Sequence, residues 1–271
     1  MAVRCPTGSA NFFEYFCPPP SDLTYRTMTL MADVANQTLA GRPELITRIR
    51  TERALQDPVG MGLGWAEETL PDQITTALGL GQRVADEALV NAGVCYPDTP
   101  EQPRPASSRF RLYRHRLLLP DWRRGKHGTG VVFYQGRAVV ETAVKYLSPP
   151  GIPKPLFGLD SLARPTGIVW LGEGPFDILP LIEAGESAVA TMGSTLKQRL
   201  IADLIVAVGD REIIIAFDRD ASGQTQAPVL ADTLTNAGAR TRIIFPPPPY
   251  TDMGEWLVAE GVHDVIADIR W

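Results

Sequence analysis

Four acidic residues stand where two apolar runs of the chain end. Glu173 and Asp177 follow the run GIVWLG, and Asp218 and Asp220 follow the run EIIIAF. Short apolar runs of this kind are typical of buried parallel strands, whose carboxyl ends carry the ligand-binding residues of open α/β sheets. Carboxylate oxygens are the ligands that Mg²⁺ prefers in proteins. The spacing therefore predicts a metal-dependent site for phosphoryl transfer.

Each of these acids also has a structural interpretation. If the second run continues as a strand, Asp218 and Asp220 point to the same side and face one ion together. Such a pair is unfavourable unless a metal or protons neutralise it. Alternatively, the acids are loop residues that cap helices, because aspartate is a frequent N-cap residue. The same choice applies to Asp177, which orients a ligand or begins a helix, and to Asp252, whose spacing from Glu255 in TDMGEWL fits a helix cap.

Basic residues concentrate in the segment 104–137, although the formal net charge of the chain is −5. Against one acid, Asp121, the segment holds Arg104, Arg109, Arg111, Arg114, Arg116, Arg123, Arg124, Lys126 and Arg137. Read as a strand, FRLYRHRL places basic residues on both faces, with aromatic residues between them. Arginine interleaved with aromatic side chains suits single-stranded nucleic acid, whose bases stack and whose phosphates pair with cations. The simpler alternative is the solvated side of a small sheet.

Several classes of protein and site are not supported by the sequence. Its 271 residues include no apolar run of the roughly 18 residues that a membrane helix needs. The start, MAVRCPTGSANFF, lacks the basic and apolar regions of a leader, so we expect a cytoplasmic protein with no membrane partner. Cys5, Cys17 and Cys95 form no CxxC pair, which argues against disulfides and against zinc. Neither a P-loop nor an HExxH or GxSxG motif occurs.

The elements that must position these residues change character near residue 160. Residues 1–25 are interpreted as an arm or linker, and apolar spacing from 26 to about 91 predicts short helices. The segments FRLYRHRLLLPD, GTGVVFYQGRAV and ETAVKYLSPP predict a small antiparallel sheet. Beyond residue 151, strand-like and helix-like segments alternate, which predicts a parallel sheet with crossover helices. The expected fold is α/β within an α+β whole, with domains at 26–160 and 161–271.

The ordered series of motifs resembles the catalytic core of bacterial-type (DnaG-like) DNA primases, which contains a Toprim domain. LGEGPFDIL resembles the first Toprim motif, TMGST the turn after the second strand, and FDRDASG the aspartate pair of the family. Upstream, RHRLLLPD, QGRAV and KYLSPP are similar to the basic strands of primases, and PLFGLDSL and VGMGLGW also have counterparts. The resemblance covers residues 55 to 258 and implies a Toprim parallel-sheet domain preceded by a helical and antiparallel-sheet basic subdomain.

This resemblance implies a nucleotidyltransferase that synthesises short RNA primers on a single-stranded DNA template from nucleoside triphosphates, with Mg²⁺ or Mn²⁺. Glu173, Asp218 and Asp220 correspond to its catalytic and metal-binding acids, and Asp252 is a further metal ligand. The residues that correspond to positions for binding nucleic acid or nucleotide are Arg114, Arg116, Arg137, Lys145, Tyr146, Lys154 and Asp177.

The chain departs from the family pattern in two respects. The third acidic motif keeps Asp252 and Glu255, but Gly254 stands where the family has a second aspartate. Neither the zinc module nor a full helicase-binding domain is matched, so a replicative helicase or a separate zinc-module protein is a candidate partner, and a phage or other mobile element is the expected source. Two alternatives stay open: a Toprim nuclease that cleaves nucleic acid, and a catalytically degenerate primase-like module that only binds it.

Overall fold

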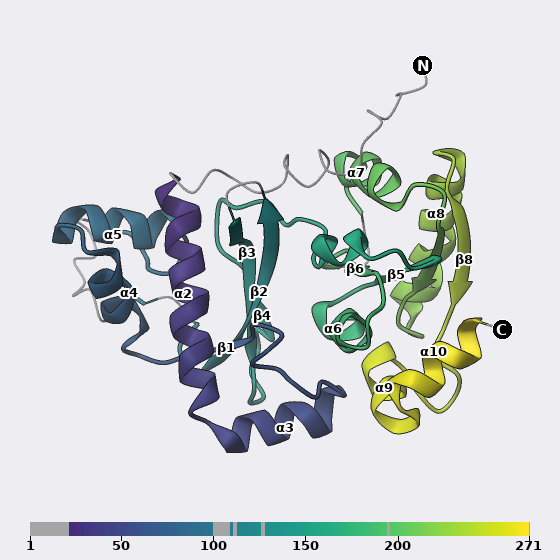
Figure 1. Cartoon of the computed structure of the whole chain (residues 1–271), viewed down its shortest axis with the longest axis horizontal. Coiled ribbons are helices and arrows are strands. Elements are labelled where there is room, and N and C mark those ends of the chain that lie inside the picture. Colours follow the sequence, from purple (N-terminus) through teal and green to yellow (C-terminus); the bar gives the residue numbers. More distant parts are fainter. Residues whose placement is uncertain (1–21, 100–108, 111–112, 126–127, 194–195, 271) are drawn as a thin grey trace. The chain divides into compact units, whose positions relative to one another are not determined.

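The computed structural model describes residues 22–99, 109–110, 113–125, 128–193 and 196–270. These residues form two compact units (Figure 1). The antiparallel unit comprises residues 22–46 and 58–153, and the parallel unit comprises residues 47–57 and 154–270. In the part of the chain that is described, no helix is long and apolar enough to cross a membrane.

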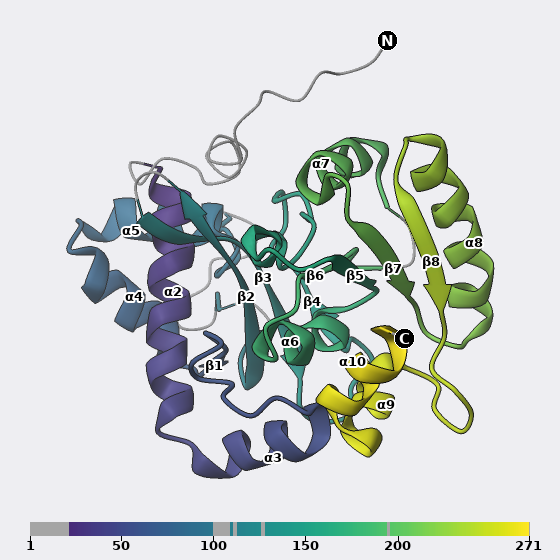
Figure 2. The same cartoon turned by 45° about the vertical axis from the view of Figure 1, so that its right-hand side comes forward.

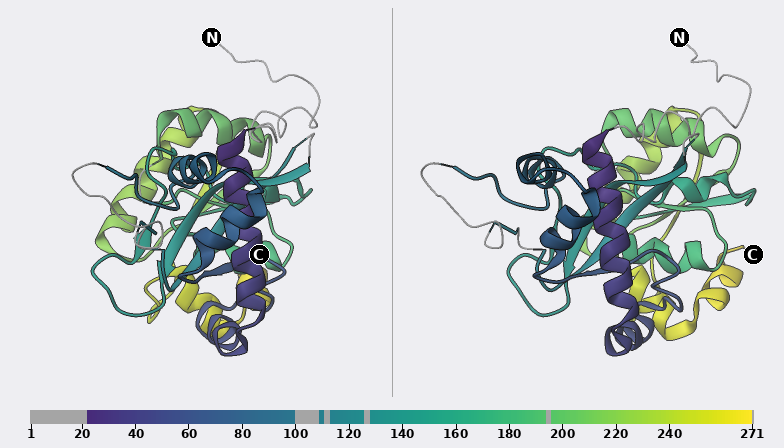
Figure 3. Two further views of the ribbon diagram at one scale, coloured as in Figure 1. Left: turned by 90° about the vertical axis from the view of Figure 1, so that its left-hand side faces the viewer. Right: turned by 60° about the vertical axis from the view of Figure 1, so that its left-hand side comes forward.

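The antiparallel unit is built on a four-stranded sheet with the order β1-β2-β3-β4. Its strands are β1 (Gly64–Ala66), β2 (Arg116–Gly125), β3 (Gly128–Ala138) and β4 (Tyr146–Leu147). The long hairpin of β2 and β3 has one irregularity, between Asp121 and Trp122. Helix α2 (Leu23–Ala40) packs against β1 and β3 and contacts α4 (Leu70–Leu78) and α5 (Gln82–Asn91), an arrangement visible in Figure 3.

The core of this unit follows from the helical spacing of α2. Met28, Met31 and Ala35 recur at three and four residues, so they share one face of the helix and are fully buried. That face packs against the sheet, where Leu118 and Tyr134 are equally buried. Apolar burial of this kind supplies most of the stability of the unit.

The parallel unit contains a four-stranded parallel sheet with the order β6-β5-β7-β8. Its strands are β5 (Ile168–Gly172), β6 (Ala188–Ala190), β7 (Glu212–Ala216) and β8 (Arg240–Ile244). The helices are α6 (Pro175–Glu183), α7 (Gln198–Val208), α8 (Ala221–Asn236), α9 (Met253–Glu260) and α10 (Val262–Arg270) (Figure 2). A short 3-10 helix, η2 (Leu159–Ala163), precedes β5. The central strands β5 and β7 are almost wholly buried, which explains their uninterrupted apolar sequences.

One segment from the helical half of the sequence belongs to the parallel unit. Helix α3 (Pro43–Arg53) begins among residues of the antiparallel unit, and its residues from 47 onward lie in the parallel unit. The carboxylate of Glu183 accepts hydrogen bonds from the backbone N–H groups of Gln56 and Asp57, at 2.7 and 2.5 Å. Glu183 thereby fixes the turn that follows α3.

The predicted α/β fold class is confirmed, with differences in detail. Residues 113–115 form a turn and the strand begins at Arg116, so the predicted alternation through FRLYRHRL is wrong there. Strand β4 is only two residues long. Residues 1–21 of the expected arm, and Arg104, Arg111 and Lys126 of the basic segment, lie outside the described residues, and Leu23–Tyr25 already belong to α2.

Candidate functional site

Two predicted acids lie at the carboxyl edge of the parallel sheet. Strand β5 ends at Gly172 and its neighbour β7 ends at Ala216, so Glu173 and Asp218 follow adjacent strand ends. The backbone N–H of Asp218 donates to Oε1 of Glu173 at 3.3 Å. The two chain segments that carry these acids are therefore joined directly, although 45 residues separate them in the sequence.

Three further acids of this edge hold backbone N–H groups. Asp177 accepts from Gly174 at 2.6 Å, Asp220 accepts from Gly223 at 2.7 Å, and Asp252 accepts from Glu255 at 2.7 Å. The first bond lies at the start of α6, and Asp220 and Asp252 are the N-caps of α8 and α9. The capping interpretation of these aspartates is thus correct. We call Glu173, Asp177, Asp218, Asp220 and Asp252 the acidic edge.

Three carboxylates of the acidic edge, those of Asp218, Asp177 and Glu173, have raised pKa values. Burial, followed by the negative charges of the other four acids, raises the pKa of Asp218 to about 8. Burial also raises the pKa of Asp177 to about 7, against the opposing effect of the Gly174 N–H. Glu173 has a raised pKa for the same first reason, with a contribution from Asp220. Each of these acids is therefore sensitive to any added positive charge.

Asp218 has the least satisfied carboxylate of the group. Its Oδ1 is buried and has no hydrogen-bond partner among the described residues. The expected strand geometry, in which Asp218 and Asp220 face the same side, does not apply, because β7 ends at Ala216 and Asp220 caps α8. Within the described chain, no three His, Cys, Asp or Glu side chains are already arranged to hold a metal ion.

The predicted basic residues have different environments within the antiparallel unit. Arg116 is 7% exposed, and its guanidinium donates to the backbone carbonyls of Val144 and Lys145 at 2.8 and 3.0 Å. Arg114 is exposed and forms an ion pair with Glu68 at 3.2 Å. The interior position of Arg116 gives it a structural role, while its predicted contact with nucleic acid or nucleotide stays a prediction.

Three other predicted residues come together where β3 and β4 pair. Arg137 donates from Nε to the hydroxyl of Tyr146 at 3.0 Å, and its guanidinium carbon lies 5.5 Å from the centre of that ring. The Nζ of Lys145 lies 6.0 Å from the same ring centre. We call Arg137, Lys145 and Tyr146 the basic cluster. Two cations beside one aromatic ring suit a nucleic-acid strand, because they offer both charge and a stacking surface.

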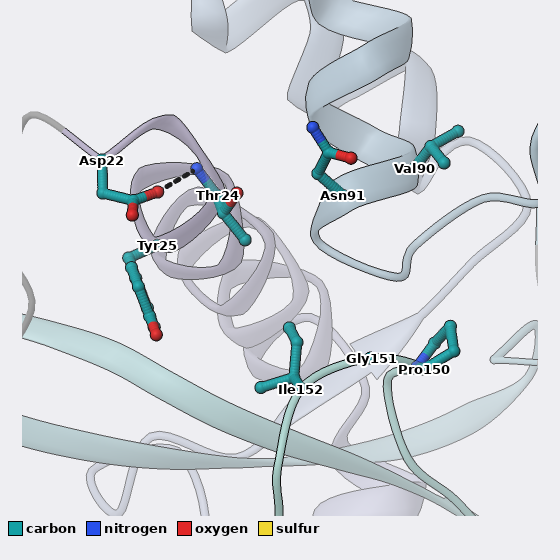
Figure 4. Close-up of a pocket in the computed structure, with 8 residues that line it drawn as sticks. All are labelled: Asp22, Thr24, Tyr25, Val90, Asn91, Pro150, Gly151 and Ile152. Carbon is teal, nitrogen blue, oxygen red and sulfur yellow. Dashed lines mark hydrogen bonds between the residues drawn. The ribbon is translucent and has the colours of Figure 1, made fainter.

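The antiparallel unit also has a hollow at the start of α2 (Figure 4). Tyr25, Asn91 and the loop at Ile152 line this pocket, which measures about 460 Å³. Its carboxylate, Asp22, already accepts a hydrogen bond from the backbone of Thr24 at 2.9 Å. None of the predicted site residues lines it.

Comparison with known proteins places this geometry in a family context. A family described as Toprim-like matches residues 170–257, the segment that carries the acidic edge. The primase of Aquifex aeolicus, solved with its zinc-binding and RNA polymerase domains, superposes with a TM-score of 0.73 at 22% identity over 93% of this chain. The fold is that of a DnaG-like primase core.

The RNA polymerase domain of the Mycobacterium tuberculosis primase DnaG superposes on this primase-like core with a TM-score of 0.71 at 22% identity. A second structure of that domain, in complex with double-stranded DNA, gives 0.71 at 21% identity. Each match covers 92% of this chain, and 82% and 80% of the respective Mycobacterium chains. The chain spans 62% of the Aquifex structure, and no curated protein matches its sequence.

Sequence reasoning missed several residues that shape the acidic edge of this primase-like core. A Cβ on Gly223 would lie 2.2 Å from the carbonyl oxygen of Asp218 and 3.0 Å from Oε1 of Glu173, so only glycine fits there. Its place in FDRDASG was noticed, but the close approach depends on how α8 folds back over the strand end. No pattern in a single sequence signals that approach.

The turn after β6 is also tied to the acidic edge. Thr191 and Gly193 donate backbone N–H groups to the carbonyls of Gly172 and Glu173, at 3.0 and 3.2 Å. Met192 between them has a φ of +62°, which is uncommon for a residue with a side chain. Lys154, one of the predicted binding residues, donates to the Met192 carbonyl at 3.2 Å. The TMGST motif therefore supports Glu173 through its backbone.

Proposed function

We propose that this chain is a primase-like nucleotidyltransferase that synthesises short RNA primers on single-stranded DNA by metal-dependent phosphoryl transfer. The observation that carries this proposal is the buried Oδ1 of Asp218, which has no hydrogen-bond partner among the described residues and lies among four other acids at the carboxyl edge of the Toprim-like sheet. The fold of a DnaG-like primase core supports it. An isolated carboxylate would not be stable in this position without a proton or a cation.

The donor set fits a hard divalent cation. All five acids of the acidic edge offer only oxygen atoms, and burial and mutual repulsion give Asp218 a pKa near 8 that a bound cation would lower. Asp218, Glu173, Asp220 and Asp252 would hold the ion, with Asp220 and Asp252 each keeping one oxygen on its helix cap. Mg²⁺ or Mn²⁺ bound there would neutralise triphosphate charge and activate the attacking 3′-hydroxyl.

Other residues of the chain would have separate roles in the reaction. Glu173 would act as a ligand or as a general base, since its raised pKa favours proton acceptance from a hydroxyl. Asp177 would keep the first turn of α6 in place through its bond to Gly174. Lys154 would contribute charge for the triphosphate beside the Met192 turn. In the antiparallel unit, Arg137, Lys145 and Tyr146 would bind the template strand.

The proposed partners follow from this chemistry. Single-stranded DNA, nucleoside triphosphates and the new RNA strand are the substrates and product. One relative of similar fold has been solved with double-stranded DNA, which supports nucleic-acid binding in general. A replicative helicase and a separate zinc-module protein are further proposed partners.

The decisive experiment offers the full chain random single-stranded DNA, ribonucleotides and Mg²⁺ or Mn²⁺, and follows product length. Extension that is lost in Asp218→Ala supports the proposal. A matched control is Asp210→Ala, because Asp210 is exposed and lies just before β7, at the opposite end of the same strand. Shortening of the DNA identifies a nuclease, and DNA binding without either reaction identifies a binding module. Both of these outcomes contradict the proposal.

A further inference from the structure

The side chain of Arg116 is directed at the backbone that leads into β4. Its Nη2 donates to the carbonyl of Val144 at 2.8 Å, and its Nη1 donates to that of Lys145 at 3.0 Å and lies 3.5 Å from that of Gly136. Guanidinium groups form strong, geometrically fixed hydrogen bonds through two nitrogens at once. The guanidinium of Arg116 thus binds carbonyl oxygens of the short segment that leads into β4.

Gly136 allows the arginine to reach that segment. A Cβ on Gly136 would lie 2.6 Å from Cδ1 of Tyr113 and 3.4 Å from Cδ of Arg116. The stem of Arg116 and the ring of Tyr113 therefore occupy the space that any larger side chain at position 136 would need. The glycine of the QGRAV motif therefore lies where the side chain of Arg116 crosses β3.

The segment that Arg116 holds has little regular structure of its own. Seven residues, 139–145, connect β3 to β4 without helix or strand, and β4 is two residues long. Val140 and Val144 in this connection are 70% and 45% exposed. Fixing such a segment costs conformational entropy, which the hydrogen bonds of a buried cation can offset.

The end of this segment carries the basic cluster. Lys145 is the last residue of the connection and Tyr146 the first of β4, and the Lys145 carbonyl accepts from both Arg116 and the backbone N–H of Ala138. These bonds determine where the Lys145 ammonium and the Tyr146 ring project beside Arg137. A shift of the 144–145 backbone would separate the two cations from the ring.

We propose that Arg116 is a positioning residue that presents Lys145 and Tyr146 to a single-stranded nucleic acid and does not itself contact the strand. The inference rests on the proposed function, because it assumes that the basic cluster binds the template. It assigns to a buried arginine a role different from the direct contact that the sequence motif predicts.

A double-mutant cycle separates positioning from direct contact. Binding of labelled single-stranded DNA is measured for Arg116→Met, for a Lys145→Ala and Tyr146→Ala variant, and for their combination. Loss of the hydrogen bonds should weaken binding about 5- to 10-fold in the natural background and less than about 2-fold when the side chains of Lys145 and Tyr146 are already removed. An equal loss in both backgrounds overturns the proposal.

Arg114→Met is the matched control, because Arg114 is an exposed arginine two residues earlier. Its effect on binding should be about the same in both backgrounds, since it touches neither carbonyl. If Arg116→Met does not fold, Arg116→Lys replaces it, because lysine keeps the charge and most of the side-chain length but lacks the fork that bonds two carbonyls at once.

Hydrogen exchange tests the positioning role of Arg116 independently of the proposed function. Amide exchange across residues 139–147 needs no nucleic acid, and it should accelerate at least about 10-fold in Arg116→Met but not in Arg114→Met. Unchanged exchange overturns the positioning role whatever the protein binds. If exchange accelerates and the natural protein shows no affinity for single-stranded DNA, the template-binding part of the proposed function fails, and the proposal for Arg116 is overturned with it.

Discussion

The acidic edge of the parallel unit and the basic cluster of the antiparallel unit differ in the partners of their charged groups. In the basic cluster, Nε of Arg137 donates to the hydroxyl of Tyr146, and Arg137 and Lys145 both lie beside its ring. At the acidic edge, the charges of the other four acids add to burial in raising the pKa of Asp218, and one oxygen of Asp218 has no partner within the described chain. The cations of the basic cluster thus share one aromatic ring, whereas the acidic edge requires a cation or protons.

This difference shows which region should respond most strongly to substitution. Removing a residue of the basic cluster takes away one contact among several that hold an extended ligand. Removing Asp218 takes away the carboxylate whose pKa is raised by the charges of the other four acids of the acidic edge. Substitutions at the acidic edge should therefore reduce activity far more than substitutions in the basic cluster. In the absence of metal, substitutions in the basic cluster should reduce stability more than those at the acidic edge.

The largest effect is expected for Asp218→Asn. Asparagine keeps the shape of the side chain but removes the charge that would hold a divalent cation, so primer synthesis should fall by a factor of about 10³ or more. Rates at saturating template, with Asp210→Asn as the control, measure this effect. A loss of less than about tenfold would place the metal elsewhere and remove the contrast between the two regions.

Gly223→Ala should have the next largest effect. The added methyl group would collide with the Asp218 carbonyl and push Oε1 of Glu173 away, so activity should fall about 10- to 100-fold and the free energy of unfolding by about 1–3 kcal/mol. Primer synthesis and thermal unfolding report the two quantities. Gly167→Ala is the control, since a Cβ there meets nothing within 4 Å, and a similar loss in both variants would contradict the packing argument.

Features of these two regions that follow from local sequence patterns were predicted, whereas features that depend on contacts between distant residues were not. The strand ends that carry Glu173 and Asp218 were predicted correctly, because apolar runs and their terminal acids are local patterns. For Asp220 the sequence left two possibilities open, a strand position on the same side as Asp218 and a helix cap, and the structure has the cap because β7 ends at Ala216. The interior position of Arg116 was also missed, because it is set by contacts with residues 20 to 29 positions away. A single sequence does not encode such contacts as a pattern.

The stability of the metal-free protein should depend on pH through Asp218. Its folded-state pKa, near 8, lies above the unfolded value near 4, so the folded state binds the proton more tightly. The stability that this group contributes is complete below about pH 4 and is lost as the pH rises towards 8. Compared with Asp218→Asn, and after a discount for solvent screening of this partly exposed group, the natural protein should lose about 1–3 kcal/mol between pH 5 and pH 8 in the presence of a chelator.

Urea unfolding of both proteins at several pH values measures this difference. Saturating Mg²⁺ or Mn²⁺ should abolish the loss, because a cation that binds only the folded state stabilises it. A difference between the two proteins that does not change with pH would show that the acidic edge is not electrostatically strained, and it would then resemble the basic cluster.

The smallest effect is expected in the basic cluster itself. Tyr146→Phe keeps the ring beside Arg137 and Lys145 but removes the hydroxyl that accepts from Arg137, whereas Tyr146→Ala removes the ring as well. Affinity for single-stranded DNA should change less than about 2-fold in the first variant and fall about 5- to 20-fold in the second, since a stacked base contributes more than this hydrogen bond. Fluorescence anisotropy with labelled DNA measures both. Equal losses in the two variants would mean that the hydroxyl orients the cations and that stacking contributes little, so the basic cluster would then act through charge, as the acidic edge does.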